Sequence, residues 1–309
     1  MIVTVTMNPC IDKTVILDGF TYGGTNRVLS TRNDMAGKGL NVSMALKAYE
    51  IESMAISFEY NGNPGAVRTM LDSAGIPHIL PAAAGGLRTN TKVFEQNARV
   101  MTELNEQGTP LSQAALADMR ETILRAAADA DFLVLSGSLP PQTPESFYRE
   151  IIQKTVRRGL RCVLDSGRAA FCEALAAKPY LIKPNVFELE QLLGRTIETP
   201  EACVQAAREA LSLGAEICCL SDGEKGAYIV SAKEAYFAEP LAVEVKSAQG
   251  AGDSMVAGLL DAMQRGLSLA DMLKHGVAGA SAKIVREGTQ MGTVADYRKF
   301  CGDVRVVSV

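Results

Sequence analysis

Short apolar segments alternate with longer amphipathic segments through the middle of the chain. Four runs of apolar and β-branched residues predict buried strands, at 132–135, 161–164, 180–183 and 216–220. The segments that precede or separate them predict helices, near 112–129, 144–158, 169–176 and 201–213. Strands that are apolar along their whole length are typical of a parallel sheet covered by helices on both faces. This pattern predicts an α/β fold.

The N-terminal third mixes buried and half-exposed patterns. Strands of the main sheet are predicted at 2–6 and 55–58, and helices at 40–46 and 64–74, the latter with proline in its first turn. Four further strands are predicted, at 14–17, 27–31, 91–95 and 99–103. The last two alternate polar and apolar residues, as a half-exposed hairpin does. We expect a small sheet, built from about 12–34 and 88–104, that projects as a lid from a single domain spanning residues 1–309.

Composition excludes several classes of function. The chain has 309 residues, 47% hydrophobic and 21% charged, with a net charge of −4 and no basic run, so neither nucleic acid nor a membrane is an expected partner. Seven cysteines without a CxxC pair, together with only two histidines, favour buried free thiols in a reducing cytosol over a zinc site. No apolar run reaches the length of a membrane span. We therefore expect a cytoplasmic protein.

Small and polar residues follow each predicted strand of the main sheet. These loops are 136–141, 165–168, 183–189 and 221–226. Because the carboxyl ends of parallel strands share one edge, the loops are expected to converge on a single crevice. The chain contains neither a G-x-x-x-x-G-K-[ST] motif nor a G-x-G-x-x-G motif after its first strand, so a P-loop and a dinucleotide fingerprint are not predicted.

The stretch Gly250-Ala251-Gly252-Asp253 opens a strongly helical segment, after a hairpin predicted at 228–230 and 235–237. The glycines allow a ligand to approach the backbone, and the start of the helix presents unpaired N–H groups to an anion. Asp253 has two interpretations on this evidence. It either caps the helix or performs chemistry beside a bound phosphoryl group.

Six segments resemble motifs of the PfkB (ribokinase-like) carbohydrate kinases. In chain order they are TMNPCID (6–12), AGKGLNV (36–42), LNEQG (104–108), SGSLPP (136–141), KPNVFEL (183–189) and GAGDS (250–254). The resemblance extends nearly from end to end and points to the phosphosugar branch, which contains 1-phosphofructokinases and tagatose-6-phosphate kinases. It implies a ribokinase-like three-layer αβα sandwich with a mainly parallel central sheet and a small β-sheet lid.

The resemblance also implies the roles of the catalytic and nucleotide-binding residues. Asp253 matches the catalytic aspartate that accepts the proton of the attacking hydroxyl, while the N–H groups of Gly250, Ala251 and Gly252 hold the transferring phosphoryl group. The positions expected to contact the nucleotide are Lys183, Asn185, Ser221, Gly223 and Gly226. Asn185 and Glu188 match an N-x-x-E motif that organises Mg²⁺ through water. The same pair is also a helix-capping pattern, and both roles are compatible.

Substrate contacts follow from the same resemblance. Asp12 matches an acid that binds sugar hydroxyls, although in isolation it is a turn residue. The matching substrate loops supply Gly37, Lys38, Gly39, Asn41, Ser136 and Ser138. Arg27 and Arg88 match positions that contact the substrate's phosphate, the alternative being two exposed arginines on a mobile flap.

The implied function is an ATP- and Mg²⁺-dependent kinase that converts fructose 1-phosphate to fructose 1,6-bisphosphate. Tagatose 6-phosphate is the near alternative, followed by a neutral-sugar or nucleoside kinase of the same fold. A non-catalytic sugar-phosphate-binding protein is disfavoured by the presence of Asp253. Assistance from a monovalent cation stays open, and a homodimer through the lid is expected.

The chain departs from the family pattern at three places. Residues 57–65 stand where relatives carry a glycine-rich turn, with Phe58–Tyr60 expected near the sugar, and Ala36 replaces a frequent glycine. Ala248-Gln249 replaces a common small or β-branched residue plus glycine.

Overall fold

A ten-stranded sheet forms the middle layer of the computed structural model, which describes residues 1–309 apart from the side chain of Arg168. In spatial order its strands are β16 (Val306–Ser308), β15 (Ala235–Ala238), β14 (Ala227–Ser231), β13 (Ile217–Ser221), β12 (Leu181–Ile182), β11 (Arg161–Asp165), β10 (Phe132–Ser136), β1 (Ile2–Val5), β4 (Ser53–Ile56) and β6 (His78–Ile79). Neighbouring strands are parallel from β6 to β13 and antiparallel from β13 to β16.

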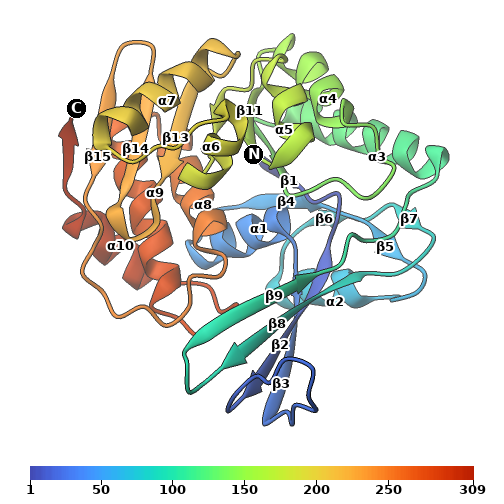
Figure 1. Cartoon of the computed structure of the whole chain (residues 1–309). Coiled ribbons are helices and arrows are strands. Elements are labelled where there is room, and N and C mark those ends of the chain that lie inside the picture. Colours follow the sequence, from blue (N-terminus) through green and yellow to red (C-terminus); the bar gives the residue numbers. More distant parts are fainter.

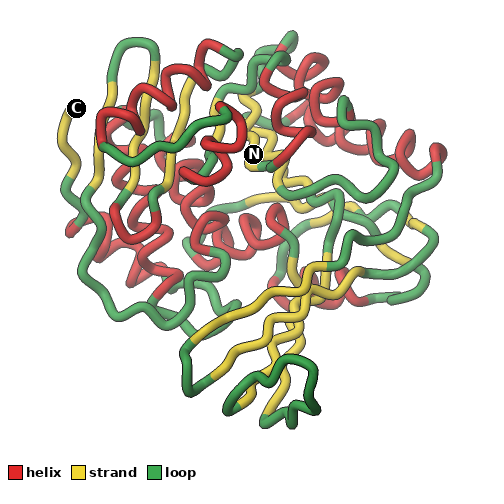
Figure 2. The backbone as a smooth tube through the Cα atoms, in the orientation of Figure 1, coloured by secondary structure: helices red, strands yellow, loops and turns green.

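Helices cover both faces of this sheet (Figures 1 and 2). One face packs against α3 (Gln113–Ala126), α4 (Phe147–Val156), α5 (Arg168–Leu175), α6 (Val186–Leu193) and α7 (Pro200–Ser212). The other face packs against α1 (Lys38–Ala48), α8 (Ala251–Gln264), α9 (Leu269–Ile284) and α10 (Val294–Asp303). A smaller cluster joins α2 (Ala66–Ala74) to Leu40 and Ala55. Two 3₁₀ turns, Ala127–Asp129 and Gly223–Lys225, complete the helical elements.

The alternating directions of the side chains along each strand explain why the hydrophobic core has two main clusters, one on each face of the sheet. Leu133 and Leu135 of β10 lie in the cluster with α3 and α4, whereas Phe132 and Val134 lie in the cluster with α1 and α8. Successive side chains of a strand point to opposite faces, so an uninterrupted apolar run supplies both layers at once. The predicted three-layer αβα sandwich is confirmed.

A four-stranded sheet projects from this body as a lid (Figure 1). Its order is β3 (Ser30–Ala36), β2 (Cys10–Leu17), β8 (Arg88–Glu95) and β9 (Val100–Asn105), with β2 and β8 parallel and the outer pairs antiparallel. These strands match the predicted lid segments, although β3 begins three residues later than the predicted strand at 27–31. The hairpin alternation predicted for 91–95 and 99–103 is also found, because β8 and β9 pair along their length.

Very short elements escaped prediction. The pair β5 (Glu59–Tyr60) and β7 (Ala82–Ala83) and the edge strands β6 and β16 contain two or three residues each, too few to show a periodic pattern. Pro64 precedes α2 instead of lying in its first turn, because Gly65 is the N-cap.

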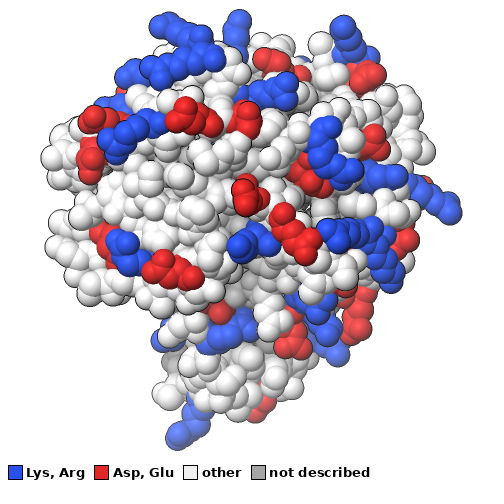
Figure 3. Space-filling model, turned by 180° about the vertical axis from the view of Figure 1, so that it is seen from behind, with Lys and Arg blue, Asp and Glu red and all other residues white. Residues whose placement is uncertain are grey.

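The surface gives two further observations. No helix in the described part of the chain is both long and apolar enough to cross a membrane. On the face shown in Figure 3, Lys and Arg side chains are interspersed with Asp and Glu side chains.

Candidate active site

The loops after the parallel strands meet at one edge of the sheet. The Gly137 N–H donates a hydrogen bond to the Asp165 carbonyl (2.9 Å), which joins the loops after β10 and β11. The Ser221 N–H donates to the Pro184 carbonyl (3.1 Å), and a parallel bridge pairs Ser221 with Asn185. The predicted convergence of these loops is therefore confirmed.

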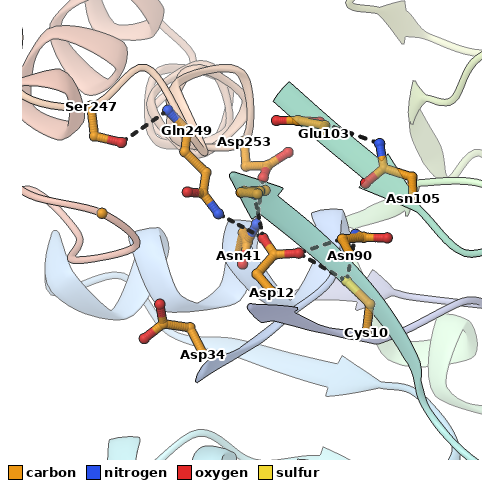
Figure 4. A network of polar contacts seen from close by, with 12 residues as sticks. Cys10, Asp12, Asp34, Asn41, Asn90, Glu103, Asn105, Ser247, Gln249 and Asp253 are labelled. Atoms are coloured by element: carbon orange, nitrogen blue, oxygen red, sulfur yellow. Dashed lines mark hydrogen bonds and ion pairs between the residues drawn. The ribbon is translucent and has the colours of Figure 1, made fainter. Parts of the chain in front are cut away.

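Asp253 lies at this edge, in the first turn of α8. The N-cap of the helix is Gly250, with a φ of 77° and no side-chain cap, so Asp253 is not the N-cap, although it is the acidic residue of the first turn. Asp253 is 6% exposed and accepts a hydrogen bond from Asn41 Nδ2 at 2.7 Å, and Figure 4 shows the two side chains pointing toward each other. A Cβ on Gly252 would lie 3.2 Å from Lys183 Nζ, so glycine leaves room for that ammonium beside the backbone.

Asp165 holds two lysines from different parts of the chain. Its Oδ1 lies 3.1 Å from Lys38 Nζ and 3.5 Å from Lys183 Nζ, and its side chain is 1% exposed. Burial alone would raise the pKa of Asp165, but the two ammonium groups hold this pKa below its usual value. In turn, Asp165 raises the pKa of Lys38. Asp165 therefore holds both ammonium groups at this edge of the sheet, with Lys183 Nζ beside Gly252 at the start of α8.

The pKa of Asp253 is raised to about 6, mainly by burial and next by repulsion from Asp165. Lys38, the hydrogen bond from Asn41 and Lys183 oppose this rise. A carboxylate with this pKa is ionised at neutral pH and accepts a proton more readily than an ordinary aspartate. This environment is appropriate for a general base.

Asn185 and Glu188 form a capping box at the start of α6. Asn185 Oδ1 accepts from the Glu188 N–H (2.8 Å), and Glu188 Oε2 accepts from the Asn185 N–H (2.9 Å). The capping role is confirmed. The second oxygen of Glu188, Oε1, lies 4.0 Å from Lys38 Nζ and is not used by the cap.

A cleft of about 620 Å³ separates the lid from the start of α1. Predicted site residues in its lining are Asp12, Gly37, Lys38, Asn41, Arg88 and Ser138. Other lining residues include Cys10, Asn90, Lys92, Glu103, Asn105 and Gln107. The cleft therefore brings together carboxylate, amide, hydroxyl and cationic groups suited to a polar, charged ligand.

Four side chains bind Asp12, and Figure 4 labels three of them, Cys10, Asn90 and Gln249. Cys10 Sγ donates to its Oδ1 at 3.5 Å. Lys92 Nζ and Gln249 Nε2 donate to its Oδ2 at 2.7 and 2.6 Å, and Asn90 Nδ2 donates to its Oδ1 at 3.0 Å. Gln249 immediately precedes Gly250, so this hydrogen bond connects the lid carboxylate directly to the loop before α8.

Arg88 is the cleft cation without a carboxylate partner. Its Nε donates to the Asn8 carbonyl at 3.3 Å, and one terminal nitrogen donates to Asn90 Oδ1 (3.0 Å) and the Glu106 carbonyl (3.1 Å). Among the described residues, no carboxylate oxygen lies within the 4.0 Å limit of an ion pair with it. Its charge is available to an anionic ligand.

Four predicted site residues occupy different surroundings from those expected. The Ser136 hydroxyl is fully buried and lies against Asp165 (3.4 Å to its carbonyl), because it belongs to β10 instead of the following loop. A Cβ on Gly39 would collide with the Val5 carbonyl, and one on Gly226 would collide with the Ala238 carbonyl, so these glycines serve packing. Arg27 is exposed in the loop between β2 and β3 and does not line the cleft. Gly223, by contrast, faces open space with a φ of 56°, which is compatible with its expected contact with the nucleotide.

The expectation that Phe58 and Tyr60 lie near the sugar is wrong. Both side chains are buried (0% and 2% exposed) in the core cluster on the α3 face, and neither lines the cleft. Their size therefore fills the core and does not shape the ligand site.

Sequence reasoning missed Asp165, Lys92 and Gln249 as site residues. Asp165 carried a signal, since a charged residue directly after a buried strand lies at the functional edge. Lys92 shares a strand face with Asn90, two residues away. Gln249 carried no signal, because its partner Asp12 is 237 positions distant.

Comparisons with known proteins agree with this arrangement. Residues 5–295 match the pfkB family carbohydrate kinase. A 1-phosphofructokinase of Xanthomonas campestris is 36% identical over 84% of this chain and 83% of the relative, and one of Bacillus subtilis is 31% identical over 99% of both. The phosphofructokinase-2 of Escherichia coli, solved with substrates and products, superposes with a TM-score of 0.91 at 28% identity over 98% of both chains. The chain belongs to the pfkB family of carbohydrate kinases.

Proposed function

We propose that the protein is an ATP-dependent 1-phosphofructokinase that converts fructose 1-phosphate to fructose 1,6-bisphosphate. The observation that carries the proposal is the position of buried Asp253 beside the Gly250–Gly252 helix start, next to a cleft whose unpaired cation is Arg88. The names of the most similar relatives support the choice of substrate.

In the proposed reaction the free primary hydroxyl of the sugar attacks the γ-phosphorus of ATP. A new O–P bond forms, the bond to the ADP oxygen breaks, and the proton of the hydroxyl passes to Asp253. The N–H groups at Gly250–Gly252 and the cations of Lys38 and Lys183 stabilise the charge on the transferring group. Asp12 and Asn41 orient the sugar hydroxyls, and Arg88 binds the phosphate at C1.

ATP is the phosphoryl donor expected of this kinase family. We propose that Mg²⁺ accompanies it, held through water by Glu188 Oε1 and the Asn185 side chain, since Mg²⁺ prefers oxygen ligands and retains waters. The proposed role is indirect because no group of three or more His, Cys, Asp or Glu side chains in the described part of the chain is arranged to hold a metal ion. A monovalent cation is a further candidate, since the phosphofructokinase-2 of Escherichia coli has been solved in complex with potassium.

The substrate is tested by an ADP-release assay over fructose 1-phosphate, fructose 6-phosphate, tagatose 6-phosphate, fructose and ribose. Fructose 1-phosphate should give the highest kcat/KM. A higher value for tagatose 6-phosphate would replace the substrate assignment but retain the mechanism, whereas a preference for fructose or ribose would contradict the phosphosugar proposal.

Replacing Arg88 with alanine should lower kcat/KM for fructose 1-phosphate by about 10- to 100-fold, mainly through KM. The change removes charge-assisted hydrogen bonds to phosphate, which contribute about 1.5–3 kcal/mol. Steady-state kinetics measure this effect, with Arg208→Ala, an exposed arginine of α7, as the control. An unchanged KM in Arg88→Ala would exclude this contact.

Activity should depend on pH with an acidic limb near 6. Asp253 must be ionised to accept a proton, so kcat/KM should fall tenfold per unit of pH below the raised pKa of about 6 and be constant above it until another group titrates. A pH profile of kcat/KM at saturating ATP measures the limb. A limb near pH 4, the ordinary value for aspartate, would show that burial does not control this base.

We also propose a homodimer formed through the lid. Phe20, Tyr22, Val28, Leu29 and Val100 are large apolar side chains exposed there, with Tyr22 at 97%. Association would cover them and would protect the strand edges. Arg27 lies in the same loop, so its predicted phosphate contact requires lid movement or the lid of a second subunit. Light scattering that detects only monomer at micromolar concentration would contradict the dimer.

A cytoplasmic location completes the proposal. The seven cysteines are free thiols, and five of them are buried, as expected in a reducing compartment. Fractionation of the producing cells tests the location.

A further inference from the structure

Lys283 is a fully buried lysine near the C-terminal end of α9. Its Nζ donates a hydrogen bond to the Gly288 carbonyl at 2.8 Å. Buried Lys92 and Lys183 each have an aspartate partner, but no carboxylate oxygen in the described residues lies within 4.0 Å of Lys283 Nζ. Burying an ammonium group without an ionic partner costs several kcal/mol, so packing alone does not explain a lysine at this position.

The side chain of Lys283 lies directly behind the anion-binding loop. A Cβ built on Gly250 would be 3.5 Å from Lys283 Cε, which places the lysine stem against the Gly250 backbone. The next residue of α9, Ile284, accepts hydrogen bonds at its carbonyl from the N–H groups of Lys246 (2.8 Å) and Ser247 (3.2 Å). The end of α9 thus supports the segment that leads into Gly250.

Gly288 also lies against the lid. Its φ is 52°, and a Cβ there would overlap the guanidinium of Arg32 on β3. The side chain of Lys283 therefore contacts two loops, because its Cε lies against Gly250 at the anion site and its ammonium binds the Gly288 carbonyl beneath the lid.

The charges around Lys283 are those of the active site. Its pKa is lowered to about 8, mainly by burial and next by Arg32, with Asp253 opposing this shift and Lys92 adding to it. With this pKa most of the lysine is protonated at neutral pH. Its positive charge is therefore present beside Asp253 and Gly250 during turnover.

We propose that Lys283 is a positioning residue whose ammonium serves as a built-in cation behind the Gly250–Gly252 anion site. It fixes the Gly250 and Gly288 loops relative to each other and offsets the negative charge that the transferring phosphoryl group brings. An internal cation at this place would make a bound monovalent ion unnecessary, so the dependence of kcat on salt decides between Lys283 and the monovalent cation considered above. The inference rests on the proposed phosphoryl transfer.

Three variants test the proposal by steady-state kinetics with fructose 1-phosphate in tetramethylammonium, potassium and ammonium salts. Wild-type kcat should differ less than twofold among the salts. Lys283→Met should lower kcat by about 10- to 100-fold, less than the 10²–10³ of a direct donor, with KM for the sugar within threefold. Lys283→Ala should regain at least fivefold in kcat with ammonium or potassium relative to tetramethylammonium. Lys274→Met, a partly exposed lysine of the same helix, is the control and should behave as wild type.

A purely structural role predicts a different result, namely lower thermal stability and unchanged kcat in the folded fraction. We expect the melting temperature of Lys283→Met to be equal to or above that of wild type, because the variant removes a buried charge. Equal kcat in wild type and Lys283→Met, or activation of the wild type by potassium above fivefold, would overturn the proposal.

A measurement without sugar separates this inference from the proposed substrate. Calorimetry with MgADP and tetrafluoroaluminate, an analogue of the transferring phosphoryl group, should show at least tenfold weaker binding to Lys283→Met and unchanged binding of MgADP alone. If the wild type does not phosphorylate fructose 1-phosphate but still binds the analogue at least tenfold more tightly than Lys283→Met, only the substrate proposal is refuted. Equal binding of the analogue to both proteins would refute the role of Lys283.

Discussion

Replacing Asp253 with asparagine should lower kcat by about 10²- to 10⁴-fold, the contribution of a positioned general base. The carboxylate is 6% exposed, adjoins the Gly250–Gly252 helix start, and its pKa is raised to about 6. Asparagine preserves the size of the side chain but cannot accept a proton. Binding of both substrates should be nearly unchanged, so the loss should appear in kcat and not in KM.

The same variant should be at least as stable as wild type. Because the pKa of Asp253 is raised, the folded state disfavours its charge at neutral pH, and asparagine removes that penalty. Thermal denaturation at pH 7 and steady-state kinetics on one preparation measure both effects. Glu287→Gln, an exposed acid in the loop after α9, is the control and should change neither. Turnover of Asp253→Asn within threefold of wild type would exclude the base.

The sequence was informative where a residue's role depends on its own neighbours in the chain. Apolar runs predicted the parallel strands, because an element buried on both faces must be apolar throughout. Since those strands share one edge, the position of each following loop could also be predicted. The capping box of Asn185 and Glu188 is equally local, because its two hydrogen bonds span three residues.

Contacts between distant segments could not be predicted in this way. Ser136 and Gly39 lie within the expected motifs, yet a shift of one or two positions places them in the packed body instead of the cleft. The position of Phe58 and Tyr60 could not be predicted either, because a large aromatic side chain in a short, non-periodic segment fits a core as well as a ligand site. The pairing of Gln249 with Asp12 depends on how the lid is placed over α8, which no local pattern encodes.

Asp165→Asn should cause the largest loss of stability, about 3–5 kcal/mol at neutral pH, the usual cost of removing one partner of a buried ion pair. Its carboxylate is 1% exposed and lies 3.1 Å from Lys38 Nζ and 3.5 Å from Lys183 Nζ. The neutral amide would leave the ammonium of Lys183, whose side chain is 5% exposed, without its counter-charge. Urea unfolding followed by circular dichroism measures the change.

The pH dependence of this loss has a definite sign. Since the pKa of Asp165 is lowered in the folded state, its stabilisation is fully present above the unfolded value of about 3.9 and disappears as pH falls through the folded value. Wild type and Asp165→Asn should therefore differ most near pH 7 and converge on strong acidification. A difference that is constant down to pH 3 would show that the charge of Asp165 is not the cause.

Removing a lysine together with Asp165 distinguishes an unpaired charge from lost packing. In Asp165→Asn/Lys183→Met no ammonium is left buried at the Lys183 position, so the double variant should recover at least half of the lost stability. It should nevertheless be inactive, because Lys183 lies beside Gly252 where phosphoryl charge develops. A double variant as unstable as Asp165→Asn would locate the effect in the hydrogen bond between Ser136 and Asp165 instead. The expected separation of stability from activity follows from one carboxylate that neutralises two cations, both of which are assigned to charge stabilisation in the proposed reaction.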